Sequence, residues 1–381
     1  MDKQLRTRLW GAIAGAFAAV TLSSSVMALE DVLDTPSMET AKATQSLLLD
    51  VAVAGGSYVA AGERGHIIFS RDQGKNWEQA QVPVSTTLTG IYFVDESNGW
   101  AVGHGGVVLS TTDGGKSWVK QMDGYLANQM VIKAAQEKIK RLETKLASAS
   151  GDKASDLEME LETATYALDD AKIDAEVGAS KPLLDVWFKD KSTGFVVGAY
   201  GYIFRTDDGG NTWKDWSANI QNVDRFHYNA ITQITGGALF IVGEAGIVFR
   251  STNNGDTWDT IESPYDGSFF GVTGTGNVNE VLAFGLRGNL FRSTNLGDSW
   301  DPVDTGVDVS LTSGWPSKGG VVTIVGVSGV VVVSNDAGET FQATERQDRL
   351  SLSNVIRLPD DHLLLFGEGG VVIADSRGRD L

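Results

Sequence analysis

Short runs of apolar residues recur along most of the chain, and glycine-rich or polar stretches separate each run from the next. Residues 90–118 are a typical unit: one apolar run, a second that ends in Gly-x-x-Gly, a third, and then a polar turn closed by an aromatic residue. Runs of about four to eight apolar residues between turn residues are typical of β-strands. The pattern therefore predicts an all-β protein made of repeated sheets.

The polar turn is the most regular part of the repeat, and it reads Ser/Thr-x-Asp/Asn-x-Gly-x-polar-aromatic. The Asp or Asn oxygen can accept hydrogen bonds from backbone amides that follow it, the glycine allows a positive φ, and the ring can pack between sheets. A calcium site is disfavoured, since calcium takes about six to eight oxygen ligands and each turn offers about one carboxylate. We assign structural roles to two residues in each of six turns: Asp72 and Trp77, Asp113 and Trp118, Asp208 and Trp213, Asn253 and Trp258, Asn295 and Trp300, and Asp336 and Phe341.

The spacing of these turns gives the size of the repeat. Apart from one long interval, successive aromatic ends are 41, 45, 42 and 41 residues apart, which is the period of a propeller blade. A seventh unit, residues 350–377, ends before its turn. We expect residues 32–45 to supply the missing outer strand and close the ring, which removes exposed sheet edges. The sequence thus predicts an all-β, seven-bladed β-propeller.

One interval is much longer than the others. Trp118 and Trp213 are 95 residues apart, and the surplus has apolar residues at helical spacing on both sides of a polar break at 148–152. Basic residues gather before the break and acidic residues after it, which favours pairing of two helices. The outer face of such a pair is either simply solvated or able to reach a partner. The predicted domains are propeller residues 29–124, an antiparallel α-helical (coiled-coil) hairpin over 125–180, and propeller residues 181–381.

The N-terminal residues and the composition restrict location and partners. Residues 1–28 combine a basic head, about fourteen apolar residues and small residues at the end, which is typical of a cleaved signal peptide and too short to span a bilayer. We therefore expect export to the periplasm. The formal net charge of −18 disfavours nucleic acid, and the absence of cysteine excludes disulfides and a lipid-anchoring cysteine. No metal-binding or nucleotide-binding motif occurs, so we expect no cofactor.

The units at 90–118 and 185–213 resemble Asp-box (BNR-repeat) propellers, and within them the photosystem II stability/assembly factor-like family. The resemblance implies a non-catalytic protein, because family members in photosynthetic organisms are assembly factors that hold newly made membrane-protein subunits. Similar proteins in other bacteria look like exported partners of resistance-nodulation-division (RND) transporters. We therefore expect a scaffold or accessory subunit of an integral membrane protein complex, with an RND-type transporter as the partner.

Strand topology suggests where a partner binds. Connections between blades and loops between second and third strands leave a blade on the same side, so the hairpin shares a face with the seven Gly-x-x-Gly loops. The variable middle residues of these loops are either ordinary solvent-facing turn residues or partner-binding residues around the mouth of the central channel. The candidates are Glu63, Arg64, His104, Tyr200, Glu244, Arg287 and Glu368.

Two other functions stay open at the level of sequence. Asp boxes also occur in sialidases, so one alternative is a carbohydrate-active propeller, sialidase-like or lectin-like. Against catalysis, Arg205, Arg250 and Arg292 fall on third strands rather than in an inner cluster. The innermost strands offer little chemistry beyond Asp185. The other alternative is a protein that binds a small or lipidic cargo in its channel.

Overall fold

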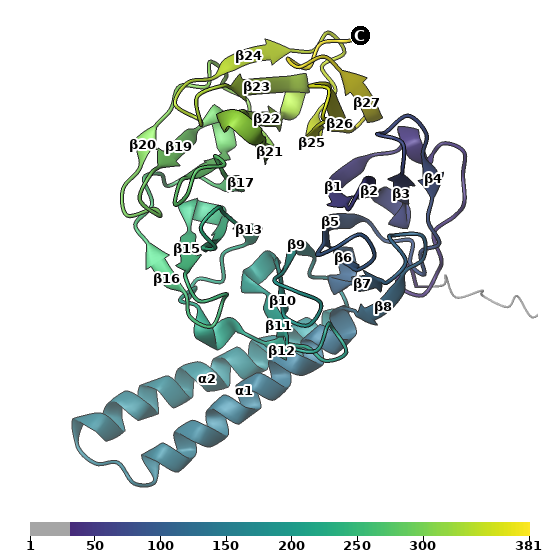
Figure 1. Cartoon of the computed structure of the whole chain (residues 1–381). Coiled ribbons are helices and arrows are strands. Elements are labelled where there is room, and N and C mark those ends of the chain that lie inside the picture. Colours follow the sequence, from purple (N-terminus) through teal and green to yellow (C-terminus); the bar gives the residue numbers. More distant parts are fainter. Residues whose placement is uncertain (1–30) are drawn as a thin grey trace, which may run out of the picture. The chain divides into compact units, whose positions relative to one another are not determined.

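Seven antiparallel sheets follow one another along the chain and are arranged around a central axis (Figure 1). The computed structural model describes residues 31–381, so the predicted signal peptide, residues 1–28, lies outside the described residues. In the described part, six sheets have four strands and the last sheet has three. The prediction of a β-propeller is confirmed, and each repeat seen in the sequence forms one sheet.

The strands of each sheet run outwards from the axis in chain order. The first three sheets contain β1 (Leu48–Ala54), β2 (Ser57–Gly62), β3 (Ile67–Ser70) and β4 (Glu78–Gln79); β5 (Leu88–Phe93), β6 (Gly99–Gly103), β7 (Val108–Thr111) and β8 (Val119–Met122); and β9 (Leu183–Phe188), β10 (Gly194–Gly198), β11 (Ile203–Thr206) and β12 (Lys214–Asp215). The next three contain β13 (Tyr228–Gln233), β14 (Leu239–Gly243), β15 (Val248–Ser251) and β16 (Asp259–Ile261); β17 (Phe269–Gly274), β18 (Val281–Gly285), β19 (Leu290–Ser293) and β20 (Asp301–Pro302); and β21 (Leu311–Pro316), β22 (Val322–Gly326), β23 (Val330–Ser334) and β24 (Gln342–Glu345). The last sheet contains β25 (Leu352–Arg357), β26 (Leu363–Gly367) and β27 (Gly370–Ala374).

Short 3-10 turns occur in most of the Gly-x-x-Gly loops. These are η2 (Glu63–Gly65), η3 (His104–Gly106), η4 (Ala199–Gly201), η6 (Glu244–Gly246), η7 (Leu286–Gly288) and η9 (Val327–Gly329). Three further turns lie elsewhere: η1 (Ala43–Gln45), η5 (Ser217–Asn219) and η8 (Lys318–Gly320).

The hydrophobic core lies between neighbouring sheets rather than at the centre of the ring. The second strand of a sheet is covered on both faces, so β6, β10 and β14 are buried along their whole length. This explains why these strands are continuous apolar runs instead of alternating ones. The indole of Trp100 on β6 stacks on the ring of Phe188 on β9, with centroids 3.5 Å apart, and so joins two sheets.

The ring is closed by direct packing of the first and last sheets. The edge of the Trp77 indole meets the ring of Phe366 on β26, with centroids 6.0 Å apart. Ser353 Oγ on β25 donates a hydrogen bond to the Leu48 carbonyl on β1 (2.5 Å). Next to this bond, the Asn354 amide donates to the Asp50 carboxylate. Residues about 300 positions apart in sequence are thus neighbours in the folded ring.

The N-terminal segment does not close the ring as a strand, so the expectation for residues 32–45 is wrong. These residues form no strand, and the last sheet has β27 at its outer edge, next to a single bridge between Ala374 and Asp380. The backbone of the N-terminal segment is bound elsewhere: the Ser37 amide donates to the Val82 carbonyl (3.0 Å) and the Ser85 amide to the Val32 carbonyl (2.8 Å). These bonds hold the first part of the segment along the connection between β4 and β5, whereas η1 at its end lies next to β27 without forming a strand.

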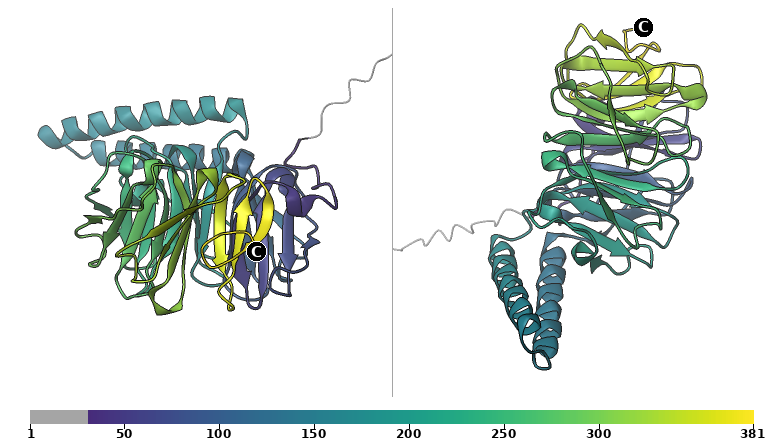
Figure 2. Two further views of the ribbon diagram at one scale, coloured as in Figure 1. Left: turned by 90° about the horizontal axis from the view of Figure 1, so that it is seen from above. Right: turned by 90° about the vertical axis from the view of Figure 1, so that its left-hand side faces the viewer.

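The predicted helices are present between β8 and β9, as α1 (Gly124–Leu146) and α2 (Asp152–Val177). They pack side by side through the buried Leu142, Leu157 and Ala164. Lys138 and Glu160 form an ion pair between them, with Nζ and Oε1 3.6 Å apart. Figure 2 shows both helices at one face of the propeller, and they extend beyond its rim (Figure 1). In the part of the chain that the structure describes, no helix is long and apolar enough to cross a membrane.

Candidate functional site

The root of the helical hairpin is held closely against the propeller. Asp123 caps α1 by accepting a hydrogen bond from the Leu126 amide (3.2 Å), which satisfies one of the free amides at the helix start. A Cβ atom on Gly124 would lie 2.8 Å from the Gly105 carbonyl oxygen in the η3 loop and 2.8 Å from the Ala179 Cα. Only glycine fits between the loop and the returning chain, so the position of the root is set by sterics as well as by hydrogen bonds.

One buried amide connects the hairpin to the third sheet. Asn128 on α1 is 6% exposed. Its Nδ2 donates to the Gly178 carbonyl at the end of α2 (2.9 Å), and its Oδ1 accepts from the Tyr202 hydroxyl (2.9 Å). Burial raises the pKa of the Tyr202 hydroxyl well above its usual range, so this group is a neutral donor at physiological pH. The asparagine thereby ties both ends of the hairpin to the sheet formed by β9–β12.

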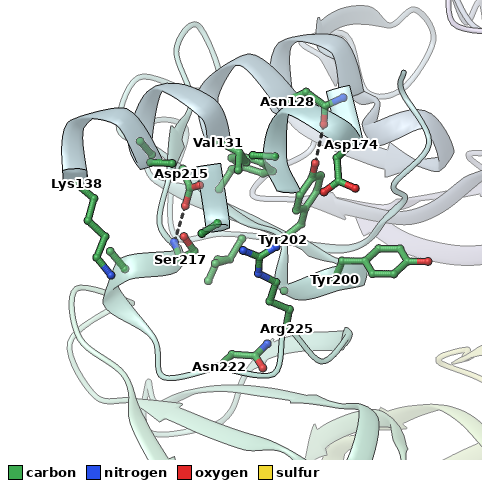
Figure 3. Close-up of a pocket in the computed structure, with 18 of the residues that line it drawn as sticks. Asn128, Val131, Lys138, Asp174, Tyr200, Tyr202, Asp215, Ser217, Asn222 and Arg225 are labelled. Carbon is green, nitrogen blue, oxygen red and sulfur yellow. Dashed lines mark hydrogen bonds between the residues drawn. The ribbon is translucent and has the colours of Figure 1, made fainter. Parts of the chain in front are cut away.

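A pocket of about 410 Å³ lies between α1 and this sheet (Figure 3). Its apolar wall includes Val131 of α1 and Phe204 of β11, and the loop that follows η5 supplies Asn222 and Arg225. Tyr200 borders the pocket and is 52% exposed. Sites of this size take a small ligand or a few residues of a peptide.

Charged groups of both signs surround the pocket. Lys181 pairs with Asp174 of α2, and its Nζ lies 5.4 Å from the ring centroid of Tyr200 and 5.0 Å from that of Tyr202. Burial raises the pKa of Asp215 on β12, while the Ser217 amide and the charge of Arg225 partly offset that rise. The pocket therefore combines aromatic surface, one cation over two rings, and hydrogen-bonding groups. This chemistry suits peptide side chains and main chain.

Of the seven loop residues proposed from the sequence, only Tyr200 lines this pocket. Three glutamates are engaged in their own sheets, where each side chain accepts a hydrogen bond from the backbone just before an innermost strand: Glu63 from Leu47 (3.1 Å), Glu244 from His227 (3.2 Å) and Glu368 from Ser351 (3.1 Å). Arg64, His104 and Arg287 are exposed. The Gly-x-x-Gly loops lie one strand further out than the channel wall, and none of the seven residues lines the channel.

The first glycine of each Gly-x-x-Gly loop is required by a close backbone approach. At Gly243 a Cβ atom would lie 1.9 Å from the His227 carbonyl oxygen, and that oxygen accepts a hydrogen bond from the Glu244 amide (3.0 Å). The same approach recurs at the corresponding glycines of the other sheets. Gly-x-x-Gly is therefore a packing motif of the propeller and not a phosphate loop.

The Asp and Asn residues of the repeated polar turn accept hydrogen bonds within their own turn. Asp208 accepts from the Thr212 amide (2.8 Å) and from the Thr206 hydroxyl (2.9 Å). Asn253 accepts in the same way from the Thr257 amide (3.0 Å). Hydrogen bonds from Asn76 hold the pKa of Asp72 down at about 2. In residues 31–381, no cluster of three or more His, Cys, Asp or Glu side chains has the arrangement of a metal site.

The central channel is a second cavity, of about 380 Å³, lined by the innermost strands of all seven sheets. Each innermost strand has a bulge at its second residue. In four sheets the bulged residue donates a hydrogen bond to a carbonyl oxygen of the next sheet: Thr89 to Leu183, Asn229 to Phe269, Thr312 to Leu352, and Ser353 to Leu48. Polar side chains thus join neighbouring sheets around the channel.

In two sheets the bulged residue is leucine, and the aspartate that follows it links to the next sheet by accepting a hydrogen bond. Asp50 accepts from the Ile91 amide of the next sheet, and Asp185 from the Ile231 amide, both at 2.7 Å. Burial raises the pKa of Asp50 to about 7, and burial together with the charge of Asp50 raises the pKa of Asp185 to about 8. Between β17 and β21, where the corresponding residues are Phe270 and Gly271, no such bond occurs among the described residues.

The three arginines considered for a sialidase-like cluster lie on the third strands and face neighbouring turns. Arg205 Nη1 lies 2.6 Å from Asp256 Oδ1, and Arg250 Nη1 lies 2.6 Å from Asp298 Oδ1. Arg292 pairs with Glu280 (3.0 Å). Arg205 and Arg250 are thus paired with the polar turn of the next sheet and Arg292 with its own sheet, and the three do not converge on one site.

Comparison with known proteins identifies the family. The family model described as "Photosynthesis system II assembly factor YCF48" matches residues 69–140 and 167–309, which together make up more than half of the chain. The chain belongs to the YCF48 family. A search of curated proteins finds no match. The residues between the two matched stretches, 141–166, comprise the end of α1, the turn after it and the first part of α2, so the tip of the hairpin lies outside the family model.

Solved structures similar to this YCF48-family protein support the fold. One, "YCF48 bound to D1 peptide", has 16% sequence identity and a TM-score of 0.59, with 87% of this chain and 93% of that chain covered. YCF48 from Cyanidioschyzon merolae has 14% identity and a TM-score of 0.57, with 89% and 97% covered. The WD40 propeller domain of Doa1 has 8% identity and a TM-score of 0.56, with 90% and 95% covered.

Of the residues that define the cavities of this YCF48-family protein, Asp185 on an innermost strand was identified from the sequence, but Asp50, Asn128, Tyr202 and Arg225 were not. Asn128 is a polar residue within an otherwise apolar helical stripe, which marks a buried hydrogen bond. Asp50 lies two positions after Leu48, and Asp185 lies two positions after Leu183. An alignment of the repeats would have placed both aspartates at the same point of the innermost strand. Tyr202 and Arg225 carry no comparable signal, because their neighbours come from distant segments.

Proposed function

We propose that this protein is a non-catalytic scaffold that holds a segment of an integral membrane protein complex in the pocket between α1 and the sheet β9–β12. The observation that carries this proposal is the pocket itself, which is bordered by Tyr200 on the loop face and by the hairpin (Figure 3). Membership of an assembly-factor family supports a binding role, and a related propeller was solved with a bound peptide. The paired arginines on the third strands argue against a sialidase-like site.

The finer parts of the proposal concern partner and location. We propose that the complex is an RND-type transporter, and that residues 1–28 are a signal peptide whose removal delivers the protein to the periplasm. The three-stranded sheet counts as the seventh blade in this proposal, and α1 and α2 form a coiled-coil hairpin. N-terminal sequencing of the protein purified from cells tests the export step. A mature chain that starts at residue 29 is expected, and a chain that retains residues 1–28 contradicts it.

Co-isolation from the native envelope tests the scaffold role. The wild-type protein is expected to retain a subunit of an RND-type transporter, and the double change Tyr200→Ala and Arg225→Ala is expected to weaken that retention at least tenfold, about 1.4 kcal/mol. Arg64→Ala with Arg287→Ala is the matched control, because both residues are exposed on the same kind of loop away from the pocket. Equal retention by both double variants contradicts the pocket, and turnover of a fluorogenic sialoside contradicts the non-catalytic role.

A further inference from the structure

The outer face of α2 carries a row of large apolar side chains in contact with solvent. Met159, Tyr166 and Ile173 are seven residues apart and are 61%, 63% and 60% exposed. Seven residues make almost two full helical turns, so the three side chains lie in line along roughly 21 Å of the helix. Val177, which is 68% exposed, continues the row by one turn. We call Met159, Tyr166, Ile173 and Val177 the α2 stripe.

The α2 stripe is separate from the surface through which α2 packs on α1. Leu157, Ala164 and Ala171 are buried, and each of them precedes a stripe residue by two positions. Two residues correspond to a rotation of about 200° around the helix axis. The buried row and the α2 stripe therefore lie on opposite faces, so the pairing of the two helices does not account for the α2 stripe.

Acidic side chains flank the α2 stripe on both sides. One flank is formed by the acids three positions after Met159, Tyr166 and Ile173, which are Glu162, Asp169 and Glu176. The other flank includes Asp170, and further along the helix Asp174 is paired with Lys181 at the pocket. The basic residues of α2 are Lys153 near its start and Lys172, whose Nζ lies 3.0 Å from Asp169 Oδ1. The surface around the α2 stripe is thus strongly negative.

We propose that the α2 stripe binds an amphipathic helix of the partner complex whose own apolar side chains are flanked by lysine and arginine. The proposal rests on the proposed function, since it assumes that the hairpin meets a partner. A seven-residue repeat along about four turns matches the seam of another helix, because helices present apolar residues at the same spacing. The acidic flanks select a partner of opposite charge, because like charges placed face to face are repelled.

Two other occupants are disfavoured by the same charges. An anionic membrane surface attracts basic segments and repels the acidic flanks of the α2 stripe. A second copy of α2 would bring Glu162, Asp169 and Glu176 against the same residues of its twin. A basic helix of another protein is the occupant that satisfies both the apolar row and its surroundings.

The test compares three variants of the full chain in the native envelope. One removes residues 125–180. The second carries Met159→Ser, Tyr166→Ser and Ile173→Ser. The matched control carries Met38→Ser, Val119→Ser and Val278→Ser, which are 67%, 66% and 62% exposed on the propeller. Circular dichroism verifies that helix content is unchanged in both serine variants. We expect the amount of partner that co-isolates to fall at least tenfold for the deletion and for the α2 stripe variant. For the control variant we expect the same amount as for wild type.

The outcomes separate the two proposals. If the deletion loses the partner while the α2 stripe variant retains it, the α2 stripe proposal is wrong and the scaffold role stands. If the deletion also retains the partner, the hairpin does not contribute and both the α2 stripe and the hairpin side of the pocket fail. In a separate experiment on the full chain, a photo-crosslinking residue in place of Tyr166 identifies what binds the α2 stripe. Crosslinks to a helical segment rich in lysine and arginine support the proposal; crosslinks to lipid, to a second copy or to nothing overturn it.

Discussion

Replacing Asp185 by asparagine should make the stability of the propeller much less dependent on pH. The carboxyl lines the channel, and burial and the charge of Asp50 raise its pKa to about 8 from an ordinary value of 3.8. A carboxyl whose pKa is higher in the folded state binds its proton more tightly there. Its contribution is therefore fully present below the unfolded pKa and is lost as the pH rises through the folded pKa.

The size of the effect follows from the two pKa values of Asp185. Each such group changes the free energy of unfolding by at most about 1.4 kcal/mol per pH unit. Between pH 5 and pH 7 the loss from Asp185 is about 3 kcal/mol, and Asp50, with a pKa of about 7, adds about 2 kcal/mol. Asparagine keeps an acceptor for the Ile231 amide and does not titrate. The Asp185→Asn protein should thus lose about 3 kcal/mol less than wild type over this range.

Urea titrations at pH 5, 6 and 7, followed by tryptophan fluorescence, measure the difference. Asp190→Asn is the matched control in the same sheet, because the Thr193 and Ser192 amides lower the pKa of Asp190 and it is ionised throughout this range. The control should shift the free energy of unfolding by a constant amount. Equal pH slopes for wild type and Asp185→Asn, or a steeper slope for the variant, would refute the assignment of a raised pKa to the channel aspartate.

Three further predictions concern the repeat and the hairpin. Asp208→Asn should change the free energy of unfolding by less than about 0.5 kcal/mol, because Asn253 makes the same turn, whereas Asp208→Ala should cost about 1–2 kcal/mol; equal losses in urea titrations would contradict the hydrogen-bonding role. Gly243→Ala should lower Tm by several degrees, since its Cβ would meet the His227 carbonyl oxygen at 1.9 Å, and Gly56→Ala, which meets nothing within 4 Å, should leave Tm almost unchanged. Tyr202→Phe leaves Asn128 Oδ1 without its donor and should speed amide exchange in the first turns of α1 by roughly fivefold, about 1 kcal/mol; faster exchange only in β9–β12 would show that the hydroxyl does not hold the hairpin.

The repeat allowed the fold to be predicted from the sequence, because each polar turn with its aromatic residue belongs to one sheet. The two helices were equally clear, since their apolar spacing differs from that of the strands. The prediction that residues 32–45 form the missing strand is wrong: hydrogen bonds to Val82 and from Ser85 hold the first part of this segment beside the β4–β5 connection, and its end lies next to β27 as a 3-10 turn. Such bonds join segments of unlike sequence and leave no periodic signal.

The candidate site was predicted less well than the fold. Tyr200 was identified as part of a variable loop, but nothing in its neighbourhood indicated that α1 would cover it. Glu63, Glu244 and Glu368 were expected at the channel mouth, whereas each binds the backbone of its own sheet. A glutamate beside a glycine looks the same in sequence whether it faces a partner or satisfies a nearby amide. The distinction depends on the backbone amide just before the innermost strand, which the fold brings within reach of the glutamate side chain.

The hydrogen bonds between innermost strands have a consequence for how the protein comes apart. A linear repeat array can lose its terminal units one at a time, because an end unit has a single neighbour. In this ring every sheet has two neighbours, and the chain ends meet where Ser353 and Asn354 reach the first sheet. Unfolding must therefore begin by parting two sheets. Among the described residues, the boundary between β17 and β21 has no polar link at the channel, so it is held there by apolar packing and further out by Arg292, whose Nε donates to the Ala337 carbonyl (3.0 Å).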